Sequence, residues 1–99
     1  MELQLTGHGV EILPTVKDYV EKKFGKLDRH FSNINSVSVE LSELKTKSQG
    51  QRYRAQVTLD VKGTLLRAEE QAENLLAAID KVVPVIDRQV ERYKGKLYK

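Results

Sequence analysis

The hydrophobic residues of this chain of 99 residues repeat with two periods, and the order in which the periods alternate limits the possible folds. Apolar and polar residues alternate in residues 2–9, 35–44 and 51–63, and a period of two predicts half-buried β-strands. A tight turn at Lys62 and Gly63 leads into a fourth strand, residues 64–69, whose inward residues are expected to include Leu66. The chain therefore supplies four strands.

Two longer segments repeat their apolar residues every three or four positions, which predicts amphipathic helices over about 14–31 and 75–96. Pro14 suits the first turn of the first helix, where its missing N–H costs nothing. Asn74 is expected to cap the second helix. Pro84 lies inside that helix on its outward side, where the core can tolerate the lost hydrogen bond.

The predicted order is strand, helix, three strands, helix, and no linker or internal repeat interrupts it. We expect a single α+β domain over residues 1–99, with a four-stranded sheet and two parallel helices on one of its faces. The opposite face of the sheet carries polar residues of mixed charge, which is typical of a solvated surface.

Composition excludes several classes of site. The chain has no cysteine, so disulfides and thiolate metal sites are excluded, and its two histidines are too few for a convincing imidazole site. It has no run of about 20 apolar residues that could cross a bilayer, and its N-terminus lacks the pattern of a secretory signal. We therefore expect a cytoplasmic protein with no cofactor.

The positive charge is concentrated near the C-terminus. The chain has a net charge of +3, yet residues 81–99 contain six Lys or Arg and two Asp or Glu, whereas residues 1–80 have a net charge of −1. Such asymmetry favours an anionic macromolecule as partner over a small-molecule substrate.

Both predicted helices sort their charges by side. The basic side of the first helix carries Lys22, Lys26 and Arg29, and that of the second carries Lys81, Arg88, Arg92 and Lys96. Like charges four positions apart, such as Lys22 with Lys26 and Arg88 with Arg92, cost about 0.2–0.5 kcal/mol a pair, so a helix optimised for its own stability avoids them. If the helices are parallel, the basic sides are expected to combine into one surface for a polyanion.

RNA or DNA fits this surface better than a membrane does, because the apolar helix faces are needed to cover the sheet. The alternative is a merely solvated face, and Lys94 and Lys96 also complement the helix dipole. Tyr19 and Tyr98 are candidates for base stacking, although rim packing and a frayed end are the favoured interpretations. His8 is interpreted as part of a plain turn, and we expect no enzyme activity.

Three segments, "LQLTGHGVEI", "VKDYVEKKFGKLDRHF" and "NLLAAIDKVVPVIDRQVERYKGKL", together resemble the ribosome hibernation-promoting factor family, also called the ribosome-associated inhibitor or S30AE family. The resemblance covers essentially the whole chain. It implies a β-α-β-β-β-α fold related to double-stranded RNA-binding domains. It also implies binding to the ribosomal RNA of the small ribosomal subunit, in the channel of messenger and transfer RNAs, which silences idle ribosomes.

The resemblance also implies the RNA-binding residues, which are basic positions on the two helices: Lys22, Lys23, Lys26, Arg29, Lys81, Arg88, Arg92, Lys94 and Lys96. Lys23 ranks lower than the others, because helical spacing puts it beside the core. Leu13 stands where the family often has a capping Thr or Ser, and Pro84 is unusual in the second helix.

The family has short members and long members with an additional C-terminal domain, and the sequence is compatible with a short protein or an N-terminal domain. We expect a monomeric domain. A general double-stranded RNA-binding module without ribosome specificity is the alternative.

Overall fold

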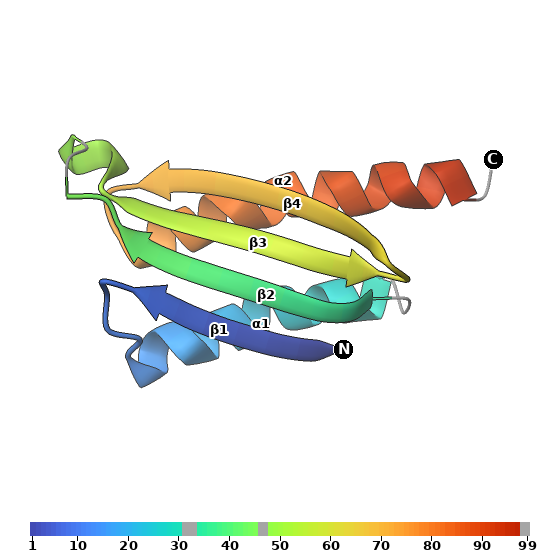
Figure 1. The fold of residues 1–99 in the computed structure, drawn as a ribbon, viewed down its shortest axis with the longest axis horizontal. Helices are drawn as coiled ribbons and strands as arrows, with labels where there is room; N and C mark the ends of the chain where they lie inside the picture. The colour runs from blue at the N-terminus through green and yellow to red at the C-terminus, as the bar shows by residue number, and fades with distance from the viewer. Residues whose placement is uncertain (31–33, 46–47, 98–99) are drawn as a thin grey trace.

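The computed structural model describes residues 1–30, 34–45 and 48–97, and for residues 28–30, 49, 96 and 97 it describes the backbone alone. A four-stranded sheet forms one layer and two helices form the other (Figure 1). The elements, in chain order, are β1 (Glu2–His8), α1 (Pro14–His30), β2 (Ile34–Glu43), η1 (Gln49–Gln51, a 3₁₀ turn), β3 (Tyr53–Val61), β4 (Thr64–Ala72) and α2 (Leu75–Leu97).

The predicted α+β fold is confirmed. The strand order is β1-β2-β3-β4, with β1 parallel to β2 and the other neighbours antiparallel. A parallel pair needs a crossover connection, and α1 provides it between β1 and β2. Both helices run in the same direction across the same face of the sheet (Figure 1). No helix in the described part of the chain is long and apolar enough to cross a membrane.

The register of the strands places one set of alternating residues on the helix side. Val39 pairs with Leu5 on one side and Val57 on the other, and all three side chains face the helices. The helices contribute their periodic apolar residues to the same core, including Phe24, which is completely buried. The core therefore lies between the two layers, as the two periods predict. The largest fully buried side chains are Phe24, Leu41, Leu59, Ile79 and Ile86.

Strand β4 is longer than predicted, because it continues to Ala72 rather than ending near residue 69. Its last part is mainly polar and shows no apolar alternation, but Ala72 pairs with Tyr53 and is completely buried. The predicted turn before β4 is present, with φ of 53° at Lys62 and 85° at Gly63. Turns with two positive φ angles match the twist of a hairpin, and glycine accommodates one of them without strain.

The two helices begin differently. The side-chain Oδ1 of Asn74 accepts a hydrogen bond of 2.8 Å from the backbone N–H of Ala77, so the predicted cap of α2 is confirmed. At α1 the carbonyl of Leu13 accepts hydrogen bonds of 3.0 Å from the backbone N–H groups of Val16 and Lys17, while the Leu13 side chain is exposed. Helix α2 continues without interruption through Pro84.

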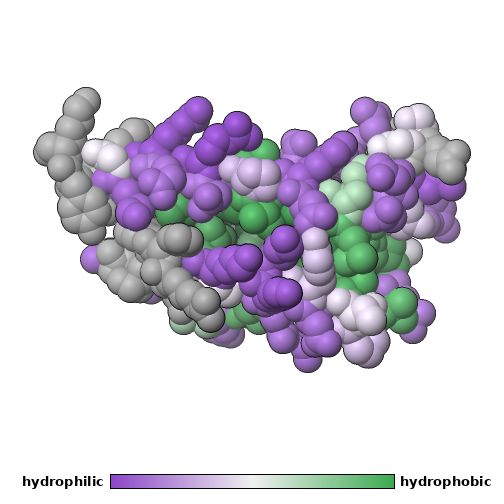
Figure 2. All heavy atoms as spheres, turned by 180° about the vertical axis from the view of Figure 1, so that it is seen from behind, coloured by the Kyte–Doolittle hydropathy of each residue, from purple (hydrophilic) through white to green (hydrophobic). Residues whose placement is uncertain are grey.

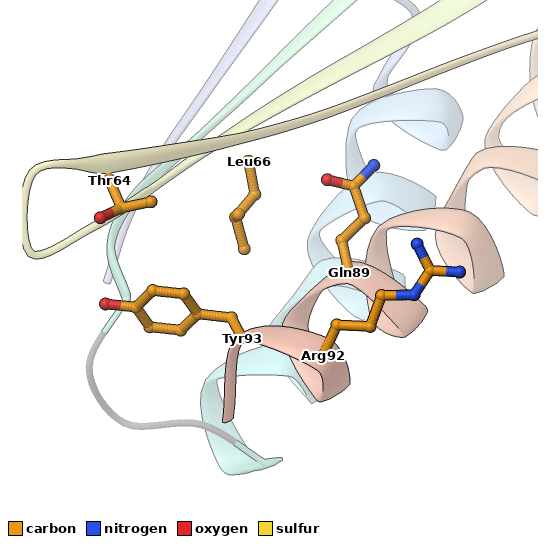
Figure 3. A pocket seen from close by; sticks show the side chains of 5 residues that line it. All are labelled: Thr64, Leu66, Gln89, Arg92 and Tyr93. Atoms are coloured by element: carbon orange, nitrogen blue, oxygen red, sulfur yellow. The ribbon is translucent and has the colours of Figure 1, made fainter. Parts of the chain in front are cut away.

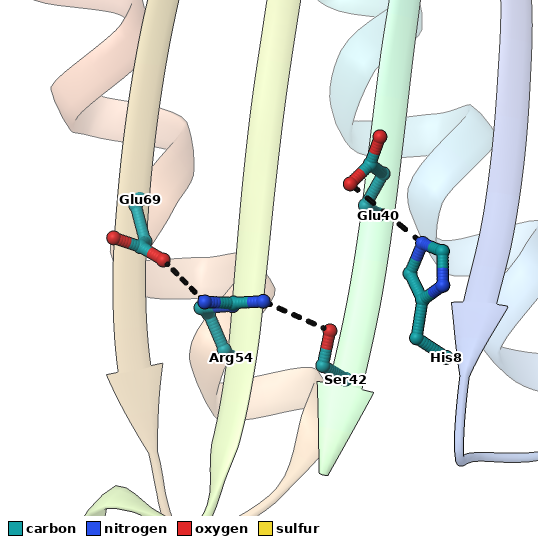
Figure 4. Close-up of polar contacts among 5 residues, drawn as sticks. All are labelled: His8, Glu40, Ser42, Arg54 and Glu69. Atoms are coloured by element: carbon teal, nitrogen blue, oxygen red, sulfur yellow. Dashed lines mark hydrogen bonds and ion pairs between the residues drawn. The ribbon is translucent and has the colours of Figure 1, made fainter. Parts of the chain in front are cut away.

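The open face of the sheet carries pairs of polar side chains (Figure 4). Arg54 lies between two strands, with nitrogen–oxygen distances of 3.1 Å to Glu69 and 3.5 Å to Ser42. His8 Nε2 lies 3.7 Å from Glu40 Oε2, and His8 is the last residue of β1 rather than part of the turn. Two of the cationic or ionisable side chains on this face, Arg54 and His8, thus lie beside neighbours of opposite sign.

Candidate nucleic-acid interface

Helices α1 and α2 are joined by a small cluster of polar side chains. The Tyr19 hydroxyl of α1 donates a hydrogen bond to the Asp80 carboxylate of α2, and this bond raises the pKa of Tyr19. Lys23 Nζ lies 3.8 Å from the same carboxylate and 5.3 Å from the centre of the Tyr19 ring. Asp80 therefore marks the side of α2 that faces α1.

Asp87 lies on the same side of α2, seven positions or two helical turns after Asp80. Together with Lys26 and Val83 it lines a cavity of about 170 Å³ between the helices. The acidic side of α2 therefore faces the basic side of α1. We call Asp80 and Asp87 the acidic row.

This arrangement corrects the expectation that the two basic sides combine into one surface. The helices are parallel and carry their basic sides on the same flank, so the basic flank of one meets the acidic flank of the other. Lys22 and Lys26 on α1, which we call the near row, are separated by the acidic row from the basic residues on the far side of α2. We call this second group, Lys81, Arg88 and Arg92, the far row.

The near row is solvent-exposed. Lys22 and Lys26 are one helical turn apart, and neither forms an ion pair with another described residue. Arg29 lies in α1 by its backbone, but its side chain is outside the described part of the structure. Lys23 has a different position, because it points into the contact with Asp80 and its side chain is 32% exposed.

The far row follows the edge of the sheet along β4. Arg88 and Arg92 are exposed, and neither forms an ion pair with any residue that the structure describes. Lys81 Nζ donates a hydrogen bond of 3.2 Å to the backbone carbonyl of Gln71 in β4. The amide of Gln89, on the same side of α2, donates to the carbonyl of Arg67. Side chains of α2 thus reach over to the strand.

The last two predicted residues stand apart from these rows. Lys94 is seven positions after Asp87, so it lies on the side of α2 that faces α1, and its Nζ is 4.0 Å from Glu91. Lys96 belongs to α2 by its backbone, while its side chain is outside the described residues. Tyr98 also lies outside them. Tyr19, the other stacking candidate, is partly buried and bonded to Asp80, in agreement with rim packing.

Seen from the helix side, hydrophilic side chains cover most of the surface, and hydrophobic residues show between them as separate patches (Figure 2). Among the predicted residues, the structure leaves Lys22, Lys26, Arg88 and Arg92 exposed, without ion pairs to described residues and without a hydrogen bond like the one that Lys81 donates to Gln71. These four cations are the strongest candidates for contacts with an external anion. We call the outward surface of α1 and α2 the helix face.

Sequence reasoning missed two features of this region. It identified Asp80 as acidic but not as the partner of Tyr19 and Lys23, since those residues are about 60 positions away and the pairing depends on how the helices pack. It also missed a cavity between α2 and β4. The helical spacing of Tyr93 predicted that its side chain faces the core, but it did not predict a cavity beside that side chain.

Comparisons with known proteins place this geometry in context. The model of the family described as Sigma 54 modulation protein / S30EA ribosomal protein matches residues 3–98. The chain is 36% identical to the ribosome hibernation promotion factor of Deinococcus radiodurans over 96 residues, which cover 97% of this chain and 50% of that protein. It is also 36% identical to the ribosome hibernation promoting factor of Klebsiella oxytoca, over 98% of this chain and 97% of that protein. The chain therefore spans about half the length of some relatives and nearly all of others.

Solved structures agree with the fold. The N-terminal domain of Thermus thermophilus protein Y has a TM-score of 0.78 and 37% identity, covering 94% of this chain and 99% of that domain. A ribosomal subunit interface protein from Coxiella burnetii has a TM-score of 0.83 over 96% of this chain and 99% of its own, and at 19% identity it supports the fold alone. The resemblance read from the sequence is confirmed: the chain belongs to the Sigma 54 modulation protein / S30EA ribosomal protein family.

Proposed function

We propose that this chain is a ribosome hibernation factor that acts in the cytoplasm, binds the small ribosomal subunit through the helix face and inhibits translation in idle cells. The observation that carries the proposal is the set of four exposed cations, Lys22, Lys26, Arg88 and Arg92, on one face of the domain. The names of the relatives support the hibernation role.

The two rows suit different parts of an RNA backbone. The guanidinium group of arginine can donate two hydrogen bonds to one phosphate, so Arg88 and Arg92 in the far row fit one stretch of RNA backbone. The near row, Lys22 and Lys26, lies on the other helix and supplies point charges for a second stretch. Acidic side chains between the rows repel phosphates there. A folded RNA with two separate backbone segments therefore matches the helix face better than a single extended strand.

Occupation of the channel for messenger and transfer RNAs would explain how the domain inhibits translation without catalysing a reaction. The channel is lined by ribosomal RNA, and a domain that covers its phosphates excludes other RNAs from the same space. This part of the proposal rests on family membership, while the position of the binding surface rests on the exposed cations.

Co-sedimentation with purified small ribosomal subunits across a salt series tests the proposal. With about six phosphate contacts, the slope of log affinity against log salt concentration is expected to be about −4 to −5. A Lys22→Glu/Arg88→Glu variant should bind much more weakly and with a shallower slope, because it loses one cation from each row and adds two repulsive charges.

A matched variant distinguishes the effect of where the charges lie from the effect of the net charge of the domain. Arg52→Glu/Arg67→Glu changes the net charge by the same amount, but these exposed residues precede β3 and lie in β4 rather than on the helices. We expect this variant to retain most of the wild-type affinity. Equal losses in both variants would contradict the helix face as the binding surface. Equally tight binding to free duplex RNA would instead indicate the general RNA-binding module.

A further inference from the structure

The cavity between β4 and α2 lies where the strand passes over the last turns of the helix. It has a volume of about 280 Å³ and is lined by Thr64, Leu66, Gln89, Arg92 and Tyr93. Thr64 and Leu66 point from the strand toward the helix, while the other three side chains rise from α2 (Figure 3). Two elements thus form a hollow with facing walls.

The walls differ in chemistry. Leu66 and the ring of Tyr93 are partly buried against the core, so they form an apolar side whose position is fixed by packing. The Gln89 amide nitrogen donates to the Arg67 carbonyl, and this bond holds the amide with its oxygen on the side of Leu66 (Figure 3). The Thr64 hydroxyl and the Gln89 amide oxygen therefore offer polar groups beside an apolar wall.

Arg92 connects the cavity to the far row. It lines the cavity and is exposed, and Arg88 stands one helical turn before it. A phosphate bound by these guanidinium groups would have its attached nucleoside next to the opening. The volume is just below the roughly 300–1,000 Å³ of pockets for drug-sized ligands, so it suits one ring system rather than a base pair.

We propose that the cavity binds one unpaired nucleobase of an RNA strand, with the base against Leu66 and Tyr93 and its phosphate on Arg92. The inference rests on the proposed function for the source of the RNA. It means that the surface contacts a base in addition to phosphates. The Thr64 hydroxyl and the Gln89 amide oxygen can form hydrogen bonds with an edge of the base. A stacked base adds affinity that depends little on salt, unlike the contacts of the two rows.

Replacement of the ring tests this contact. Tyr93→Leu keeps an apolar side chain but removes the stacking surface, and it should weaken binding to small ribosomal subunits by about 5- to 100-fold. Tyr93→Phe should retain most of the affinity. Tyr53→Leu, a matched change at the start of β3, should have little effect, and thermal unfolding of each variant verifies that the domain is folded.

The slope of affinity against salt separates the base contact from the phosphate contacts. Tyr93→Leu should lower the affinity without changing the slope, whereas Lys22→Glu/Arg88→Glu should change both. Wild-type affinity of a folded Tyr93→Leu variant, with binding still lost in the charge-reversal variant, would overturn the base pocket and leave the proposed function intact.

Nuclear magnetic resonance tests the pocket without ribosomes. Oligouridylate should shift the methyl resonances of Leu66 and the ring resonances of Tyr93 in the full chain. An abasic oligonucleotide of the same length should leave them unchanged, because it has the phosphates but no base. Equal shifts with the abasic strand would overturn the inference, and so would uridine monophosphate binding as tightly as oligouridylate, since that result would assign the pocket to a free nucleotide.

Discussion

Asp80 accounts for the difference between two neighbouring lysines of α1. Lys22 is exposed, whereas Lys23 lies by Asp80 and over the ring of Tyr19. The lower rank of Lys23 was predictable from helical spacing, which puts it beside the core. Its partner was not predictable, because like charges sorted along one helix do not indicate which side faces the neighbouring helix.

The Tyr19–Asp80 hydrogen bond is expected to stabilise the domain modestly. Tyr19→Phe keeps the ring and should lower the free energy of unfolding by about 0.5–1 kcal/mol, a small value because Asp80 is half exposed. Urea unfolding at neutral pH measures the difference. Tyr53→Phe on β3, whose hydroxyl donates to Glu43, provides a comparison away from the helix contact.

The hydrogen bond between Tyr19 and Asp80 also predicts that the stability of the domain depends on pH. The pKa of Tyr19 is raised above its usual value of 10.0 by the hydrogen bond to Asp80, so the folded state holds this proton more tightly than the unfolded state. The stabilisation is therefore complete below pH 10 and is lost as the pH rises through the folded pKa. The difference in stability between wild type and Tyr19→Phe should shrink above pH 10, and a constant difference would contradict the role of the hydroxyl.

At the scale of elements, the hydrophobic periods predicted every helix and three of the four strands closely. Strand β4 was too short in the prediction, since its last residues are polar and are held in place by pairing with β3. Strand pairing depends on two segments, so the sequence of one segment alone does not predict where the paired strand ends. The parallel direction of the helices, in contrast, followed from the order of the elements.

Helix α2 is expected to be more stable without its internal proline. Pro84 cannot donate a hydrogen bond to the carbonyl of Asp80, and the side chain is exposed, so Pro84→Ala should raise the free energy of unfolding by about 1–3 kcal/mol. Thermal unfolding should show a higher midpoint, by about 4–8 °C for each kcal/mol.

Pro84→Gly provides the comparison, because glycine restores the N–H but is a poor helix former. It should give a gain smaller than that of alanine by about 1 kcal/mol. Destabilisation by both changes would show that the proline ring makes a packing contribution that outweighs the missing hydrogen bond.

At the scale of the whole molecule, charge alternates across the helix face as basic, acidic and basic rows. Each row was predictable from its own helix, but their order across the surface was not. The order depends on the relative orientation of two packed helices, and the predicted single basic surface was wrong for this reason. The acidic row faces the near row, where Lys26 and Asp87 line the same cavity.

The acidic row is expected to weaken nucleic-acid binding. Asp87→Asn removes one negative charge between the two basic rows and should strengthen binding to RNA about twofold at low salt, because unit charges about 10 Å apart in water interact by roughly 0.4 kcal/mol. Fluorescence anisotropy with labelled duplex RNA measures the change.

Glu2→Gln makes the same change in net charge on β1, away from the helices. It should have a smaller effect on RNA affinity than Asp87→Asn. Equal gains in both variants would show that RNA responds to the total charge of the domain rather than to the helix face.

The hydrogen bonds from Lys81 and Gln89 to β4 have a consequence for self-association. An open strand edge is a template on which a second chain can add a strand, and here the carbonyls of Gln71 and Arg67 are already occupied by side chains of α2. These two contacts therefore block part of the β4 edge against the addition of a further strand. If Lys81 moves to an RNA phosphate, the Gln71 carbonyl loses its donor, so binding to RNA would leave this part of the edge more open to a second strand.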